Sequence, residues 1–470
     1  MRLPMMRTAT GTLLLSLCGA AHAATADADP ELVQRGAYLA TAGDCAACHQ
    51  NPTHGDGFSG GYALQSPLGT IYGSNITPSL KYGIGQYSLE DFTRVMRKGV
   101  APGNHYLYPA MPYTAFAGMS DDDLKALYSY LMLGVKPVDK PAPETKLGFP
   151  FSLRPAMFFW NALFLNQGVV PGADAAPGSS ERGEYLVKTL AHCSTCHTPR
   201  NLMMAESGDK LLAGGKVNGW TAPNITPDPA AGIGNWRQDE IVTYLKTGAL
   251  HGKAIAAGEM GTAVSASFSK LDDSDLLSIA RYLRGVPPIN NGETTPRSGG
   301  THSAPAPLGQ IETGMSADIR SYIDTANMSG AQIYNGACAA CHGNDGRGTQ
   351  DAQHFYPSLV GSSAVGSADP ANLIMTVAEG VNRVTPAGHA FMPAFANQFT
   401  SAELTKVVDY VSTAFGSPTH HVSQRTVEET LQSGQPNALL RYAGAIIWAG
   451  VAVVALGVAG FSIRRRKKRT

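Results

Sequence analysis

The 470-residue sequence has no cysteine to spare. Six of its 7 cysteines fall into three copies of one short motif, and Cys18 lies in an apolar stretch near the N-terminus. No thiol is therefore left for a disulfide, a zinc site or a nucleophile. Its one GxGxxG match, Gly55–Gly60, lies in the glycine-rich loop just after the first motif and not between a predicted strand and a helix, so it is no nucleotide-binding fingerprint. The 36 basic residues balance 36 acidic ones. These features argue against a dinucleotide-binding domain and against nucleic acid as a partner.

Each of the three motifs reads Cys-x-x-Cys-His, and they occupy 45–49, 193–197 and 338–342. A single copy would suit a redox-active dithiol, and two Cys-x-x-Cys pairs would suit a zinc ribbon. Two thiols about one helical turn apart also add across the vinyl groups of one porphyrin, and the adjacent imidazole then reaches the iron. Three copies favour this last interpretation and predict three covalent haem c groups. The predicted attachment residues are Cys45, Cys48, Cys193, Cys196, Cys338 and Cys341, and the predicted proximal iron ligands are His49, His197 and His342.

A methionine recurs 12 residues after a glycine in each part of the chain that holds a motif. A haem iron with His and Met ligands is closed to small molecules, and the thioether raises its potential, which suits electron transfer. Buried core methionines would be the plainer explanation, and His389 is a rival to the third methionine. We predict Met111, Met260 and Met392 as the sixth ligands, and Met119 as a packing residue.

The segments around the motifs repeat, which predicts a mostly α-helical chain of three tandem class I cytochrome c-like domains. Asn75–Pro78 recurs as Asn224–Pro227, 149 residues later, and a constant offset indicates duplication. Each unit ends in a capped segment with apolar residues at i, i+3, i+4 and i+7, which predicts an amphipathic terminal helix packed on the helix that leads into the motif. Tyr130, Tyr282 and Tyr410 of the terminal helices are expected to meet Tyr38, Tyr185 and Tyr334.

Both ends of the chain carry membrane-related signals. Residues 1–23 predict a secretory signal peptide, because basic residues precede an apolar run that ends in Ala21-His22-Ala23. Near the other end, 441–463 contains an uncharged run of 22 residues, followed by the basic tail 464–470. This pattern predicts a C-terminal transmembrane helix in the bacterial cytoplasmic (inner) membrane, with periplasmic haem domains and a cytoplasmic C-terminus.

The composition between the motifs sets the predicted domain boundaries. Phe149–Leu165 is crowded with aromatic side chains, and we expect it either to dock a partner or the membrane surface, or to fill the groove between two units. The predicted divisions are 1–23 signal peptide, 24–140 cytochrome c domain 1, 141–179 apolar and Pro-rich linker, 180–290 domain 2, 291–325 linker, 326–418 domain 3, 419–440 stalk, 441–463 transmembrane helix and 464–470 tail.

Three stretches make the sequence resemble a known family: Gly69–Tyr72 leading to Asn75–Pro78, Tyr82–Gly85, and Leu107–Tyr113. The family is the three-haem cytochrome c subunit of bacterial membrane-bound dehydrogenases, which serve alcohol, gluconate, sorbitol and fructose oxidation. The resemblance implies that this chain is no enzyme by itself and receives electrons from a catalytic subunit that is FAD-dependent or, as a second choice, PQQ-dependent. It further implies ubiquinone as the acceptor, and it allows a small third subunit.

A second function stays open at this point. A free-standing, membrane-anchored multihaem cytochrome could donate electrons to a terminal oxidase or peroxidase without any dehydrogenase. A catalytic haem enzyme is disfavoured, since each predicted haem has a candidate methionine to close it.

Overall fold

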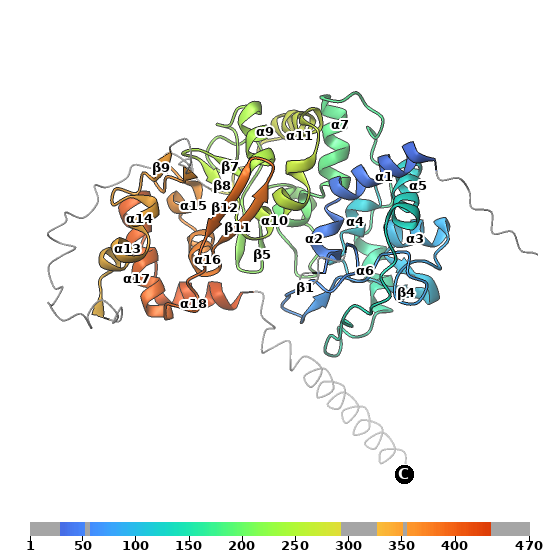
Figure 1. Cartoon of the computed structure of the whole chain (residues 1–470), viewed down its shortest axis with the longest axis horizontal. Helices are drawn as coiled ribbons and strands as arrows, with labels where there is room; N and C mark the ends of the chain where they lie inside the picture. The colour runs from blue at the N-terminus through green and yellow to red at the C-terminus, as the bar shows by residue number, and fades with distance from the viewer. Residues whose placement is uncertain (1–28, 52–56, 293–326, 351–354, 434–470) are drawn as a thin grey trace, which may run out of the picture.

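The computed structural model describes residues 29–51, 57–292, 327–350 and 355–433. Helices dominate these residues, and each sheet among them is a two-stranded antiparallel ribbon. Three helical units follow one another in chain order, and the second unit lies between the first and the third (Figure 1).

The first unit begins with helix α1, Pro30–Ala42, which leads into the first motif. It ends with α5, Asp121–Ser129, and the side chains of Asp29 and Ser120 cap these two helices. The cap at Ser120 is the one that the sequence predicts. The other elements are α2 (Cys45–His49), α3 (Leu89–Lys98), α4 (Tyr113–Phe116), the turns η1 (Pro102–Asn104) and η2 (Tyr130–Gly134), and the ribbons β1–β2 (Ala63–Leu64 with Ile71–Tyr72) and β3–β4 (Val100–Ala101 with His105–Tyr106).

The second unit repeats this plan after a linker that contains helix α6, Ala156–Phe164. Its leading helix α7, Ser180–Tyr185, continues as the π-helical turn η3, Leu186–Leu190. The other elements are α8 (Ser194–His197), α9 (Gln238–Thr247), α10 (Gly258–Ala266), α11 (Asp273–Gly285), the turns η4 (Gly208–Lys210) and η5 (Phe268–Lys270), and the ribbons β5–β6 (Gly215–Val217 with Trp220–Ala222) and β7–β8 (Ala249–Leu250 with Ala254–Ile255).

The third unit differs most, because a five-residue ribbon precedes its terminal helix. It also includes α18, Gln424–Gln432, within the stretch assigned to a stalk, and Val427 of this helix is buried in the core of the third unit. The other elements are α13 (Gly330–Ala337), α14 (Ala339–His342), α15 (Ser363–Gly366), α16 (Ala371–Glu379), α17 (Ser401–Val411), the turn η8 (Ser412–Gly416), and the ribbons β9–β10 (Thr349–Gln350 with Phe355–Tyr356) and β11–β12 (Val381–Thr385 with Gly388–Met392).

In each unit the terminal helix packs on the leading helix, as the sequence predicts, and the structure shows that the two helices cross at a glycine. A Cβ atom on Gly36 of α1 would lie 2.0 Å from the carbonyl oxygen of Ala126 in α5, so a larger residue would force the helices apart. The equivalent pairs are Gly183 with the carbonyl oxygen of Ser278, at 2.0 Å, and Gly330 with that of Lys406, at 2.1 Å.

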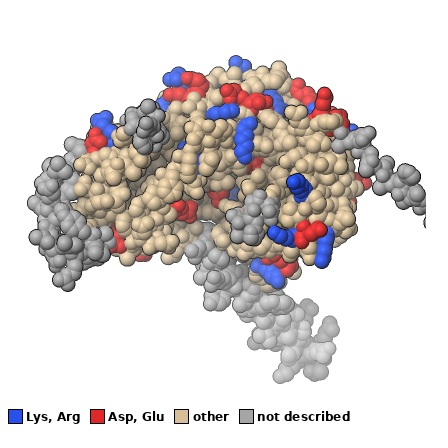
Figure 2. Space-filling view, viewed as in Figure 1, with Lys and Arg blue, Asp and Glu red and all other residues tan. Residues whose placement is uncertain are grey.

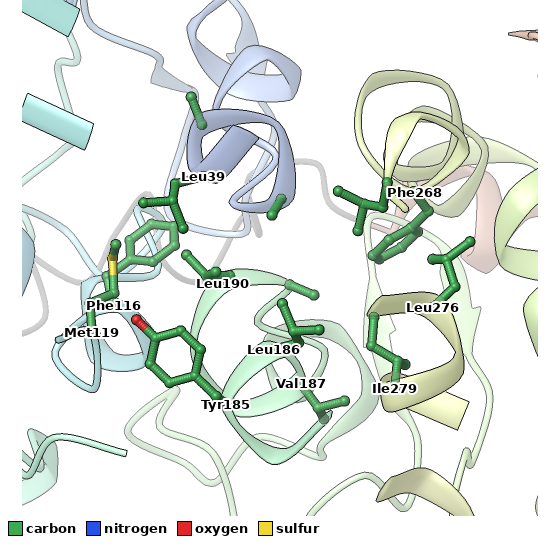
Figure 3. Close-up of a cluster of buried hydrophobic side chains, with 14 of the residues drawn as sticks. Leu39, Phe116, Met119, Tyr185, Leu186, Val187, Leu190, Phe268, Leu276 and Ile279 are labelled. Atoms are coloured by element: carbon green, nitrogen blue, oxygen red, sulfur yellow. The ribbon is translucent and has the colours of Figure 1, made fainter. Parts of the chain in front are cut away.

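The first two units share one hydrophobic core, whereas the third has its own. Figure 3 shows Leu39, Phe116 and Met119 of the first unit facing Tyr185 and Leu190 of the second. Burial of apolar area is the main stabilising term in folding. The first two units therefore stabilise each other through side chains that neither would bury alone.

The expected tyrosine pairs form in only one of the three units. Tyr334 and Tyr410 lie with ring centroids 5.5 Å apart, as predicted. The prediction is wrong for Tyr38 and Tyr185, which instead donate hydrogen bonds to carboxylates of the neighbouring unit. Nothing in the sequence of one unit indicates that its tyrosine hydroxyl bonds to the other unit.

The predicted fold class needs a correction. No helix within the described ranges has both the length and the apolar character needed to cross a bilayer, so the prediction of a fold with a C-terminal transmembrane helix is not upheld. The segment chosen for that helix, 441–463, lies outside the described residues, as does the signal peptide at 1–23. The fold is a mostly helical arrangement of cytochrome c domains.

Candidate haem sites

Each motif histidine is oriented by a hydrogen bond from its ring. The Nδ1 atom of His49 lies 2.7 Å from the carbonyl oxygen of Ser74, and assigning its proton to Nδ1 leaves Nε2 free to bind a metal. A backbone carbonyl that fixes one ring nitrogen is typical of haem and metal ligands. The equivalent pairs are His197 with Pro223, at 2.6 Å, and His342 with Pro357, at 3.0 Å.

The surroundings keep these groups uncharged. Burial lowers the pKa of His49, His197 and His342, which favours the neutral imidazole that ligates iron. Burial also raises the pKa of the Cys45 and Cys193 thiols to about 12. Thiols in such apolar surroundings suit thioether links to a porphyrin better than metal-thiolate chemistry.

The three candidate methionines stand in different backbone settings at the same spacing. Met111 precedes α4, Met260 lies in the first turn of α10, and Met392 ends β12. Met111 and Met260 pack against the core shared by the first two units, and Met392 packs against the third core. Their assignment as sixth ligands stays a prediction.

The other candidate ligands have structural roles. Met119 is fully buried, as expected of a packing residue. His389 places Nε2 2.7 Å from the side-chain oxygen of Asn382 across the β11–β12 ribbon, so that nitrogen is already engaged.

These donor sets fit covalently bound haem c. Each unit brings two thiols and an oriented imidazole onto one short stretch, with a thioether elsewhere in the same unit. When bound, the haem supplies a one-electron iron couple, and the protein sets its potential through the axial ligands and the surrounding charges.

The first two sites lie near each other. Helix α2, which bears the first motif, packs on α10, which bears Met260. Burial, followed by the charges of Asp44, Glu259 and Cys196, raises the pKa of the Cys48 thiol to about 12, so the two motifs are close enough to interact. His192, just before the second motif, packs against Phe116 of the first unit with ring centroids 5.6 Å apart. This proximity suits electron transfer between the two sites.

The third unit is held to the second by polar contacts. The side chain of Asn372 accepts a 2.8 Å hydrogen bond from the Thr221 amide and donates one of 2.8 Å to its carbonyl. The Ser363 amide donates a 2.7 Å hydrogen bond to the carbonyl of Lys253, and Lys216 forms an ion pair with Asp369. No signal in the sequence identifies these contacts, because they join segments about 110 to 150 residues apart.

The aromatic linker is half anchored and half exposed. Trp160 is buried and donates a 2.9 Å hydrogen bond from Nε1 to the carbonyl of Met203 in the second unit. Asn161 accepts a 2.8 Å hydrogen bond from the Tyr113 hydroxyl, two residues from Met111. In contrast, Phe158, Phe159 and Leu163 are 55%, 70% and 70% exposed, and Leu202 and Met203, in the segment that Trp160 contacts, are exposed as well. We call these five residues the α6 face.

Comparisons with known proteins agree with this geometry. The family model described as "Cytochrome c" matches residues 33–133, and "Cytochrome C oxidase, cbb3-type, subunit III" matches 325–411. The chain is 39% identical to the fructose dehydrogenase cytochrome subunit of Gluconobacter japonicus, over 99% of both chains. It is 36% identical to the cytochrome c subunit of alcohol dehydrogenase (quinone) from Gluconobacter oxydans (strain 621H), over 92% of this chain and 88% of that one. It is 35% identical to the gluconate 2-dehydrogenase cytochrome c subunit of Pantoea cypripedii, over 91% and 97%.

Proposed function

Because this chain belongs to the family of cytochrome c subunits of dehydrogenase complexes, we propose that it binds three haem c groups and carries electrons from a catalytic dehydrogenase subunit to ubiquinone. The chain is itself an electron-transfer subunit and not the catalytic one. The observation that carries the haem count is the threefold recurrence of a Cys-x-x-Cys-His motif whose imidazole is tied to a backbone carbonyl.

The proposed donor is a subunit that oxidises a sugar or an alcohol. Relatives named for fructose, gluconate and alcohol dehydrogenases support this substrate class. We place an FAD-dependent subunit first and a PQQ-dependent one second. The relative named alcohol dehydrogenase (quinone) supports a quinone acceptor. We place the haem-bearing units in the periplasm, since bacteria attach haem c outside the cytoplasm.

The α6 face is the proposed docking surface for the catalytic subunit. Exposed aromatic, Leu and Met side chains are typical of the cores of protein interfaces. Helices that lie on anionic membranes carry cations on their polar face, whereas α6, AMFFWNALF, has no charged residue. Its anchor at Tyr113 places the bound partner next to the segment that bears Met111, where electrons would enter the first haem.

The surface charge agrees with a protein partner. On the face shown in Figure 2, acidic and basic side chains are interspersed and most of the surface is uncharged. A nucleic-acid site would show a basic stripe.

The test is purification of the complex after mild detergent extraction, followed by mass measurement and substrate-driven haem reduction. We expect a co-purifying dehydrogenase, a mass that includes three haems per chain, and reduction of haem on addition of the substrate. A chain that carries only two haems would contradict the proposed count. A chain that purifies alone and is reduced by no dehydrogenase would contradict the proposed role and favour the free-standing cytochrome.

A further inference from the structure

Arg383 belongs to the third unit but lies inside the second. It stands on β11, is only 4% exposed, and donates a hydrogen bond from Nη1 to the carbonyl oxygen of Ala256. Gly248, which ends α9 with a φ of +72°, makes room for it, since a Cβ atom there would collide with the guanidinium. The contact carbonyl lies four residues before Met260 in the chain.

The buried guanidinium has no anion of its own. Its Nε atom has no hydrogen-bond partner, and Arg383 forms no ion pair with a carboxylate among the residues that the structure describes. Burial also lowers its pKa, which reflects the cost of keeping the charge away from water. Buried cations persist in proteins when an anion compensates them.

A cavity of about 240 Å³ lies beside this group, at the junction of the units. It is lined by Arg383, by Trp220 and Gly258 of the second unit, and by two carboxylates. The two carboxylates are Glu259 and Glu379, and neither pairs with Arg383. Glu259 accepts hydrogen bonds from Tyr62 and Asn218, and Glu379 accepts a hydrogen bond from Trp220.

We propose that Arg383 binds a propionate carboxylate of the haem attached to the second unit, at Cys193 and Cys196, and so raises the reduction potential of that haem. This inference rests on the proposed presence of a haem in the second unit. A guanidinium and a carboxylate form a strong, charge-assisted and geometrically matched pair. The haem propionates are anions of that chemistry at the edge of a haem whose predicted sixth ligand is Met260, and the cavity reaches the residues just before it.

The effect on potential follows from charge. Reduction lowers the net charge of the haem by one unit, so a nearby buried cation stabilises the reduced state. Charges within a low-dielectric interior interact much more strongly than charges in water. The cation that acts on the haem of the second unit is thus one side chain of the third unit, Arg383.

The experiment is a spectroelectrochemical titration of the unmodified holo-subunit and of five variants. We expect Arg383→Gln to lower one of the three midpoint potentials and Arg383→Lys, which keeps the charge, to restore most of the shift. The affected haem should be the one whose potential also falls in Met260→His. Asn372→Ala weakens the same junction through Thr221 but leaves the charge, and it should leave all three potentials in place.

Three results would overturn the inference. Unchanged potentials in Arg383→Gln with all haems bound would exclude the contact. An equal shift in Asn372→Ala would assign the effect to docking, and a shift confined to the haem altered by Met392→His would assign the cation to the third site. Absence of haem from the second unit, seen in the intact mass of the unmodified protein, would instead contradict the proposed function.

Discussion

Tyr185 of the second unit donates a 2.6 Å hydrogen bond to the buried carboxylate of Asp123 in the first. The first unit returns the contact, because Tyr38 donates a 2.8 Å hydrogen bond to Asp275 of the second. Each carboxylate also forms an ion pair with an arginine of its own unit, Arg35 with Asp123 and Arg182 with Asp275. Each of the first two units therefore donates one tyrosine hydroxyl to a carboxylate of the other unit. We call this pair of hydrogen bonds the tyrosine exchange.

Removing one hydroxyl from this exchange should destabilise both units. Tyr185→Phe leaves Asp123 without one hydrogen bond to a buried charge, which costs about 1–3 kcal/mol. Denaturant unfolding, monitored away from the haem absorbance, measures the change. Tyr128→Phe is the matched control, since its hydroxyl donates to the neutral carbonyl of Tyr87 and should cost less. If both variants lost the same free energy of unfolding, the hydrogen bond to Asp123 would stabilise the protein no more than an ordinary tyrosine hydrogen bond.

The helix crossings should tolerate no side chain at the contact glycine. Gly330→Ala places a methyl group 2.1 Å from the Lys406 carbonyl oxygen, and such overpacking costs about 1–3 kcal/mol or more. Gly336→Ala, in the same helix α13 with no atom near its Cβ position, should be neutral or stabilising by about 1 kcal/mol. Thermal unfolding of the third unit compares them. A stable Gly330→Ala protein would contradict the crossing geometry.

Binding of carbon monoxide can distinguish a methionine that ligates iron from one that only packs in the core. Met111→Ala, Met260→Ala and Met392→Ala should each open one iron of the reduced protein to carbon monoxide. Met119→Ala, which removes a fully buried side chain, should cost about 2–5 kcal/mol of stability and open none. Carbon monoxide difference spectra decide the matter, and a ligand variant that binds no carbon monoxide would lose its assignment.

The α6 face should be needed for the complex and not for the fold. Replacing Phe158, Phe159 and Leu163 with Ser should leave stability within about 0.5 kcal/mol, since all three are exposed, while the catalytic subunit dissociates. Reduction of haem by the substrate should fall with it. Binding is measured by co-purification and by titration of the separated subunits.

Two controls sharpen that experiment. Leu80→Ser and Leu133→Ser remove side chains that are 68% and 58% exposed elsewhere on the first unit, and they should leave the complex intact. Trp160→Ala removes the buried anchor and should destabilise the subunit itself by about 3–5 kcal/mol. A triple variant that keeps its partner but loses affinity for lipid vesicles would assign the face to a membrane.

Local patterns in the sequence predict the parts of each unit better than the way units meet. The Ser120 cap, the apolar stripe from Leu124 and the helix that leads into each motif are visible because they depend on residues a few positions apart. The hydrogen bonds of Tyr38 and Tyr185 to the neighbouring unit could not be predicted, because the sequence does not show whether each tyrosine contacts its own unit or the other one. Arg383 is equally hidden, because its surroundings come from another unit.

At the candidate haem sites, too, local features could be predicted from the sequence and contacts between distant segments could not. Cys-x-x-Cys-His spacing predicts the attachment residues, and the carbonyl that orients each motif histidine follows that histidine by 15 to 26 residues along the chain. The burial of Trp160 against Met203 could not be predicted, and it separates an aromatic run into an anchor and an exposed face. Amphipathic pattern in a nine-residue helix is too weak to assign those two sides.

The joint core of the first two units bears on how such chains change in evolution. A deletion that removed either copy would strip the other of apolar cover and leave Asp123 or Asp275 without its tyrosine. We therefore expect the first two units to be gained or lost in evolution as a pair. The third unit has its own core and meets the second through a polar seam that includes the buried Arg383, so recombination can exchange this unit where the replacement keeps that contact.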